Sequence, residues 1–133
     1  MKNEKFPKIV ACTLVERRGK YFLIKEVLED GCEYWIVPGG KVEFGESLEN
    51  AAKRETEEES GMEIEILKFL GHHEAVFPDL NYHSVIFFFL GKSESTNFTL
   101  ENKALDGKFF SKEEIKKLNL VSSAKWLFET LEF

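Results

Sequence analysis

A run of glutamates near the middle of the chain has the spacing of a cation-binding helix face. Glu55, Glu58 and Glu59 fall at positions i, i+3 and i+4, so on a helix they share one face within a turn. Like charges this close repel one another unless something neutralises them. Clusters of carboxylate oxygens suit Mg²⁺ or Mn²⁺, which prefer carboxylate, carbonyl and water ligands. The alternative interpretation is a solvated acidic helix face.

A glycine-rich segment precedes this acidic run. Gly39 and Gly40 stand directly after Pro38, and Gly45 follows five residues later. Glycines allow a tight backbone path and leave no side chain to block an approaching phosphate. Lys41 follows the glycine pair, so it is either a contact for a terminal phosphate or an ordinary exposed lysine. The two segments together predict a site for a metal ion and a phosphate ester.

These residues resemble the signature of the Nudix hydrolase family, G-x5-E-x7-R-E-U-x-E-E-x-G-U, and in particular its MutT-like members. Every fixed position is filled, by Gly40, Glu46, Arg54, Glu55, Glu58, Glu59 and Gly61. Met62 supplies the final bulky apolar position. Thr56 departs from the usual aliphatic residue, but it is β-branched and can still pack. The run from Trp35 to Pro38 also resembles the strand that enters this loop, and the resemblance covers nearly the whole chain.

The resemblance implies an α/β fold, a Nudix-type α/β/α sandwich with a mixed β-sheet between helices. It also implies a Mg²⁺-dependent hydrolase, with Mn²⁺ as a second usable ion, that cleaves a nucleoside diphosphate linked to another moiety. In that case Glu55, Glu58 and Glu59 hold the metal together with the Gly39 carbonyl. Either Glu55 or Glu58 orients or deprotonates the attacking water, and Arg54 orients the neighbouring carboxylates. Further carboxylates outside the signature are candidates at Glu74 and Glu101.

The signature indicates the type of reaction and leaves the small nucleotide substrate open. Gly40 and Lys41 are candidate phosphate contacts, and Phe77 and Tyr82 are aromatic candidates for stacking on a base, although core packing is the default for each. We expect hydrolysis of (d)NTPs to the monophosphate. ADP-ribose and dinucleoside polyphosphates are the alternative substrates. A non-catalytic nucleotide-sensing module is the alternative from another functional class.

The elements that must position these residues follow from the apolar patterns. Helices are expected at 47–60, with Gly61 as the C-terminal stop, at 122–132, and briefly after Ser111, which starts a Ser-x-x-Glu capping box. Strands are predicted at residues 9–15, 21–27, 34–37, 63–70 (with a continuation to 77 left open) and 83–90. The last of these strands is apolar on both faces, which favours an interior position in the sheet.

Length and charge exclude several classes of protein. The 133 residues are expected to form one domain, 1–133, and 18 basic against 24 acidic residues give a net charge of −6. Nucleic acids and anionic membranes both require a basic face, so neither is expected as a partner. Residues 1–8 are polar and the longest apolar run is 85–90, so we expect no signal peptide, no membrane span and a cytoplasmic location. Both a monomer and a homodimer remain open.

Overall fold

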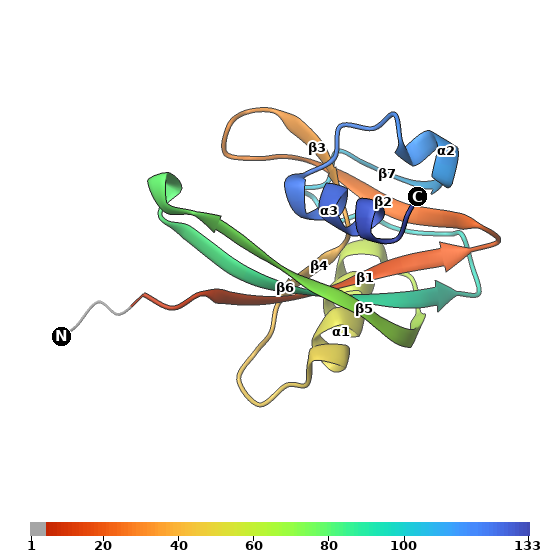
Figure 1. The fold of residues 1–133 in the computed structure, drawn as a ribbon. Helices are drawn as coiled ribbons and strands as arrows, with labels where there is room; N and C mark the ends of the chain where they lie inside the picture. The colour runs from red at the N-terminus through yellow and green to blue at the C-terminus, as the bar shows by residue number, and fades with distance from the viewer. Residues whose placement is uncertain (1–4) are drawn as a thin grey trace.

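Seven strands form one mixed sheet in the computed structural model, which describes residues 5–133 (Figure 1). The strands are β1 (Lys8–Arg17), β2 (Lys20–Val27), β3 (Glu33–Ile36), β4 (Gly39–Lys41), β5 (Ile64–Phe77), β6 (Tyr82–Ser93) and β7 (Asp106–Ser111). The helices are α1 (Leu48–Ser60), α2 (Lys112–Ile115) and α3 (Ser122–Thr130), with a short 3₁₀ turn η1 (Pro78–Leu80). Of the polar N-terminal segment considered above, residues 1–4 lie outside the described part of the chain.

Strand β1 is the junction of the sheet, whose main path runs β3-β2-β1-β6-β5. The second half of β1 pairs with β2, whereas its first half pairs with β4, so the sheet divides along this strand. Strand β6 runs parallel to β1 and antiparallel to β5, and it is therefore flanked on both sides, as its apolar sequence predicts. Strand β7 pairs with β2. The mixed α/β sheet that the sequence predicts is confirmed.

The two longer helices cover opposite faces of this sheet (Figure 1). Ala51 and Ala52 of α1 pack against Ala11 and Phe89, and their small side chains let the helix lie close to the strands. On the other face, α3 contributes Ala124, Leu127 and Phe128 to the largest core cluster. No helix within residues 5–133 is long and apolar enough to cross a membrane.

Local capping signals define the helix that carries the glutamates. Helix α1 begins at Leu48 because Ser47 is its N-cap, and the Ser47 side chain accepts a hydrogen bond from the Asn50 N–H at 3.1 Å. Gly61 ends the helix with φ = 69°, in the left-handed region where glycine is favoured, and its N–H donates to the Glu57 carbonyl. The capping box at Ser111 is also present and starts α2.

The structure adds two strands to the expected elements and shifts several element ends. Residues 39–41, predicted as part of a loop, form strand β4 and pair with β1, and β7 was not predicted as a strand. Both are short strands formed through pairing with segments distant in sequence, which local propensity does not report. Helix α3 ends at Thr130 and β3 lies one residue earlier than expected. Strand β5 extends to Phe77, which is the longer of the two alternatives.

Candidate active site

The glycine pair brings β4 into direct contact with its neighbours on both sides. A Cβ added at Gly39 would lie 2.5 Å from the Cys12 sulfur and 2.6 Å from its Cα. A Cβ added at Gly40 would overlap the carboxylate of Glu55 on α1. The two glycines therefore have different roles, because Gly39 permits pairing with β1 and Gly40 leaves room for a glutamate.

The backbone of Gly39 faces α1. Its strand neighbours make the ladder bonds to β1, with Thr13 N–H donating to Pro38 O at 3.0 Å and Val42 N–H donating to Ile9 O at 2.9 Å. In an antiparallel pair bonded and non-bonded positions alternate, so Gly39, opposite Cys12, directs its N–H and its carbonyl away from β1. The N–H donates to Glu59 Oε1 at 2.7 Å. The Gly39 carbonyl therefore points toward the same side as Glu59.

Glu59 is the most enclosed of the three glutamates, with 6% of its surface exposed. Burial raises the pKa of its carboxyl to about 8, against the lowering effect of the hydrogen bond from Gly39. The negative charges of Glu26, Glu101 and Glu55 raise it further. At neutral pH this carboxyl is therefore largely protonated unless a cation is close by.

Arg54 organises the carboxylates around it. Its guanidinium makes a two-pronged pair with Glu46, with distances of 2.7 Å from Nε and 3.0 Å from Nη2. Nη1 lies 2.9 Å from Glu55 and 3.4 Å from Glu58, and Nη2 donates to the Lys41 carbonyl at 3.2 Å. The hydrogen bonds from Arg54 lower the pKa of Glu46 to about 2. Arg54 thus joins the loop before α1 to the helix and holds Glu55 in place.

Comparison with known proteins agrees with this arrangement of a glycine strand and an acidic helix. The model of the NUDIX domain family matches residues 5–131, which is nearly the whole chain. The chain belongs to the Nudix family. A curated relative, phosphatase NudJ of Escherichia coli K12, is 32% identical over 73 residues, which are 55% of this chain and 47% of that protein. The match thus spans about half the length of the relative.

Solved structures show the same Nudix fold. A MutT NUDIX hydrolase from Burkholderia pseudomallei superposes with a TM-score of 0.86 at 24% identity, covering 96% of this chain and 99% of that one. A NUDIX hydrolase from Nitrosomonas europaea gives a TM-score of 0.81 at 22% identity and covers 96% and 89% of the two chains. A structure from Jonesia denitrificans, described as a possible asymmetric diadenosine tetraphosphate hydrolase, gives 0.82 at 15% identity and covers 96% and 94%.

Helix α1, which we call the Nudix helix, offers ligand atoms that fit a divalent cation of the kind that Nudix hydrolases generally use. Only oxygen donors are offered, and Glu59 is a buried carboxyl surrounded by other carboxylates. Glu55 is 22% exposed and Glu58 is 52% exposed, so the three side chains lead from the interior to solvent. Within residues 5–133, no three acidic, histidine or cysteine side chains are already grouped as metal ligands. Arg54 forms ion pairs with Glu55 and Glu58.

The one departure from the Nudix signature is accommodated in the core. Thr56 is fully buried, and its hydroxyl donates to the Pro38 carbonyl at 3.4 Å. A threonine therefore packs at this position and also contacts the backbone just before the glycine pair.

The segment after β6 brings a fourth carboxylate to the site. Glu101 N–H donates to the Glu59 carbonyl at 3.3 Å, next to a bond from Thr99 N–H to the Ser60 carbonyl at 2.8 Å. Glu74, the other distal candidate, lies instead on β5 and pairs with His83 at 3.8 Å. Of the two candidates, the structure brings only Glu101 beside the Nudix helix.

Sequence reasoning did not single out Glu26, which also acts on the charge of Glu59. Glu26 lies on β2 and follows the buried residues Phe22 and Ile24 in strict alternation. A carboxylate that continues an apolar face of a strand was the available signal. Burial raises the pKa of Glu26, which the charge of Lys103 lowers in turn.

The aromatic candidates lie away from the glutamates. Phe77 and Tyr82 face each other across the β5–β6 hairpin, with ring centroids 6.0 Å apart, and Tyr82 packs against the core on the α3 face. Ala11 of β1 pairs with Gly40 on one side and with Phe87 of β6 on the other. Tyr82 precedes Phe87 by five residues, which is a distance of about 16 Å along β6. The structure therefore joins Gly39, Gly40 and Lys41 to the Nudix glutamates and does not join these two rings to them.

Proposed function

We propose that this chain is a Mg²⁺-dependent pyrophosphohydrolase that cleaves (d)NTPs to the monophosphate and pyrophosphate. The observation that carries the proposal is the placement of two of the Nudix glutamates, Glu55 and Glu59, beside the free edge of β4. Glu59 accepts from Gly39 there, and Glu55 occupies the space that Gly40 leaves open. Residues 1–133 would act as one domain.

The metal ligands in this proposal are Glu55, Glu58, Glu59 and the Gly39 carbonyl. When bound, Mg²⁺ would neutralise phosphate oxygens, polarise the phosphorus and lower the pKa of a bound water. Glu58 is the most exposed of the three and Glu55 is held by Arg54, so either carboxylate can orient the attacking water. Glu101, whose negative charge raises the pKa of Glu59, would add a further carboxylate.

Substrate contacts in this proposal begin at the glycine strand. Gly40 would leave the space beside Glu55 free of a side chain, and the exposed Lys41 side chain would contact a terminal phosphate. Phe77 and Tyr82 lie about 16 Å farther along the sheet, so only the end of a substrate distant from the cleaved bond would reach them.

The test is product formation from a panel of nucleotides, with Mg²⁺ and again with a chelator. The panel contains (d)NTPs, ADP-ribose, dinucleoside polyphosphates and nucleotide sugars, and the products are separated by chromatography. We expect monophosphate and pyrophosphate from (d)NTPs, and no product without the metal. Preferred cleavage of another member would move the substrate assignment to that member. Nucleotide binding without any hydrolysis would indicate a sensing module and reject the enzyme.

A further inference from the structure

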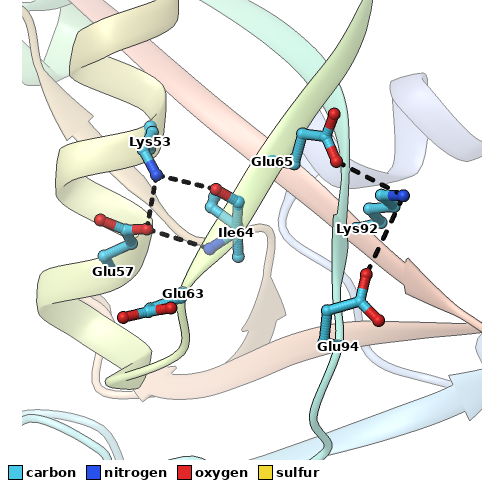
Figure 2. Close-up of a pocket in the computed structure, with 7 residues that line it drawn as sticks. All are labelled: Lys53, Glu57, Glu63, Ile64, Glu65, Lys92 and Glu94. Atoms are coloured by element: carbon cyan, nitrogen blue, oxygen red, sulfur yellow. Dashed lines mark hydrogen bonds and ion pairs between the residues drawn. The ribbon is translucent and has the colours of Figure 1, made fainter.

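Two side chains of α1 hold the backbone of the first residue of β5. Lys53 Nζ donates to the Ile64 carbonyl at 2.8 Å, and Glu57 Oε2 accepts from the Ile64 N–H at 2.9 Å (Figure 2). Lys53 and Glu57 also pair with each other at 2.9 Å. Ile64 is buried, so its backbone N–H and carbonyl need hydrogen-bond partners, and two side chains of α1 supply them. We call Lys53, Glu57 and Ile64 the clamp.

The clamp lies on the opposite flank of α1 from the glutamates. At about 100° per residue, the midpoint of Lys53 and Glu57 is about 180° around the helix axis from Glu55. One flank of the helix is thus joined to β4 by Glu59 and Gly39, and the other flank is joined to β5 by the clamp. The helix is thus held to the sheet along both of its flanks.

The buried surface between these two flanks is formed largely by small side chains. Its buried residues include Ala51, Ala52 and Ser60, whose small side chains interlock only shallowly with the strands. A roll of about 10° moves an atom at the rim of a helix, about 5.5 Å from the axis, by about 1 Å. A misplacement of this size can lower a catalytic rate by about 100-fold.

The order of Lys53 and Glu57 along α1 indicates that the pair does more than stabilise the helix. Lys53 precedes Glu57, which is the less favourable order for an ion pair at i and i+4 on a helix. Both residues stand at variable positions of the Nudix signature, so the signature itself does not require them. Their common partner is Ile64.

We propose that Lys53 and Glu57 are positioning residues for the hydrolysis, because the clamp fixes the rotation of α1 and with it the places of Glu55, Glu58 and Glu59. This inference rests on the proposed function. It assigns a role to two residues that touch neither the metal nor the substrate.

The test uses the full chain with Lys53→Met and with Glu57→Met, assayed well below the melting temperature of each variant. Methionine keeps the apolar stem of Lys53 and removes its charge. We expect kcat to fall about tenfold and KM for the nucleotide to change less than about threefold. The affinity for Mn²⁺, titrated without nucleotide, should fall about fivefold because the same carboxylates are displaced. Lys53→Arg should retain most of the activity.

Lys92→Met is the matched control. Lys92 and the three clamp residues line one hollow of about 330 Å³ (Figure 2). Lys92 pairs there with Glu65 at 3.4 Å and Glu94 at 3.9 Å and makes no bond to α1. Lys92→Met removes one positive charge from the surface, as Lys53→Met does, and should leave kcat and the Mn²⁺ affinity unchanged. Hydrogen exchange at the Ile64 amide should speed up in Glu57→Met, which removes the acceptor, and not in Lys92→Met.

The possible results separate this inference from the proposed function. An active parent protein with unchanged kcat and Mn²⁺ affinity in both clamp variants would overturn the inference alone. Equal losses in Lys92→Met, or no retention in Lys53→Arg, would overturn it as well. A parent protein that hydrolyses no nucleotide would reject the proposed function, and the Mn²⁺ affinities would then decide whether the clamp positions the carboxylates.

Discussion

At the scale of single residues, the site depends on close contacts at the glycine pair and at Arg54. Gly40 faces the Glu55 carboxylate, Gly39 faces the backbone of β1, and Arg54 binds Glu46 through two nitrogens. The family signature contains most of these residues, so their importance was predictable from the sequence. The reason for each was not, because it depends on which atoms the fold brings together.

Substitution of Gly40 should mainly lower activity, whereas substitution of Gly39 should mainly lower stability. In Gly40→Ala the new methyl group displaces the flexible end of Glu55, so we expect kcat to fall about 100-fold with little change in stability. In Gly39→Ala the methyl group meets backbone atoms of β1, so the free energy of unfolding should fall by about 1–3 kcal/mol. Urea unfolding and steady-state kinetics on both variants measure this, and a fully active Gly40→Ala protein would contradict it.

The Arg54–Glu46 pair predicts a pH-dependent stability. The pKa of Glu46 is about 2 in the folded chain and near 4.3 for a free glutamate, so the carboxylate stabilises the fold above pH ~4.3 and loses this effect as pH falls toward 2. Glu46→Gln should therefore be less stable than the parent protein at pH 6, and the difference should shrink below pH ~4. Urea unfolding across this range measures the difference, and one that grows at low pH would have the wrong sign.

At the scale of elements, local signals predicted what local interactions decide. Ser47, Gly61 and the capping box at Ser111 each define a helix end through bonds to residues within four positions, and all three were readable from the sequence. Strands β4 and β7 were not, because their partners β1 and β2 are distant in the chain. Glu26 acts on Glu59 in the same non-local way, whereas Glu101 was already a candidate from the family resemblance.

The N-cap of α1 should stabilise the fold through the hydrogen bond that the Ser47 side chain accepts. Ser47→Ala removes the acceptor of the Asn50 N–H and should lower the free energy of unfolding by about 1 kcal/mol. Ser47→Asp, which keeps an acceptor, should remain close to the parent protein. Thermal unfolding distinguishes the two, and equal losses in both variants would show that the cap does not matter.

At the scale of the whole molecule, the acidity of the chain is concentrated at one place. Residues 46–59 hold six glutamates against one lysine and one arginine, so most of the net charge of −6 lies on the loop and helix of the site. The sheet supports this segment from both sides, with β4 against Glu59 and β5 against the clamp. A cation bound there would convert a surface that repels phosphates into one that binds them.

Metal binding should therefore stabilise the whole fold. A cation that binds only the folded chain raises its stability by about 2.7 kcal/mol at 100 times the dissociation constant. Mg²⁺ should raise the melting temperature of the parent protein and have a much smaller effect on Glu59→Gln. A chelator should reverse the shift, and an equal shift in both proteins would place the cation elsewhere.

The most direct test of the catalytic assignment is kcat for pyrophosphate release by Glu58→Gln beside Glu49→Gln at saturating Mg²⁺. Both substitutions remove one negative charge from α1, but Glu49 lies in the exposed first turn of the helix, away from Arg54 and β4. We predict that Glu58→Gln loses at least ~100-fold in kcat and that Glu49→Gln stays within about twofold of the parent protein. Equal activity of the two variants would contradict the assignment of the Nudix glutamates as the catalytic centre.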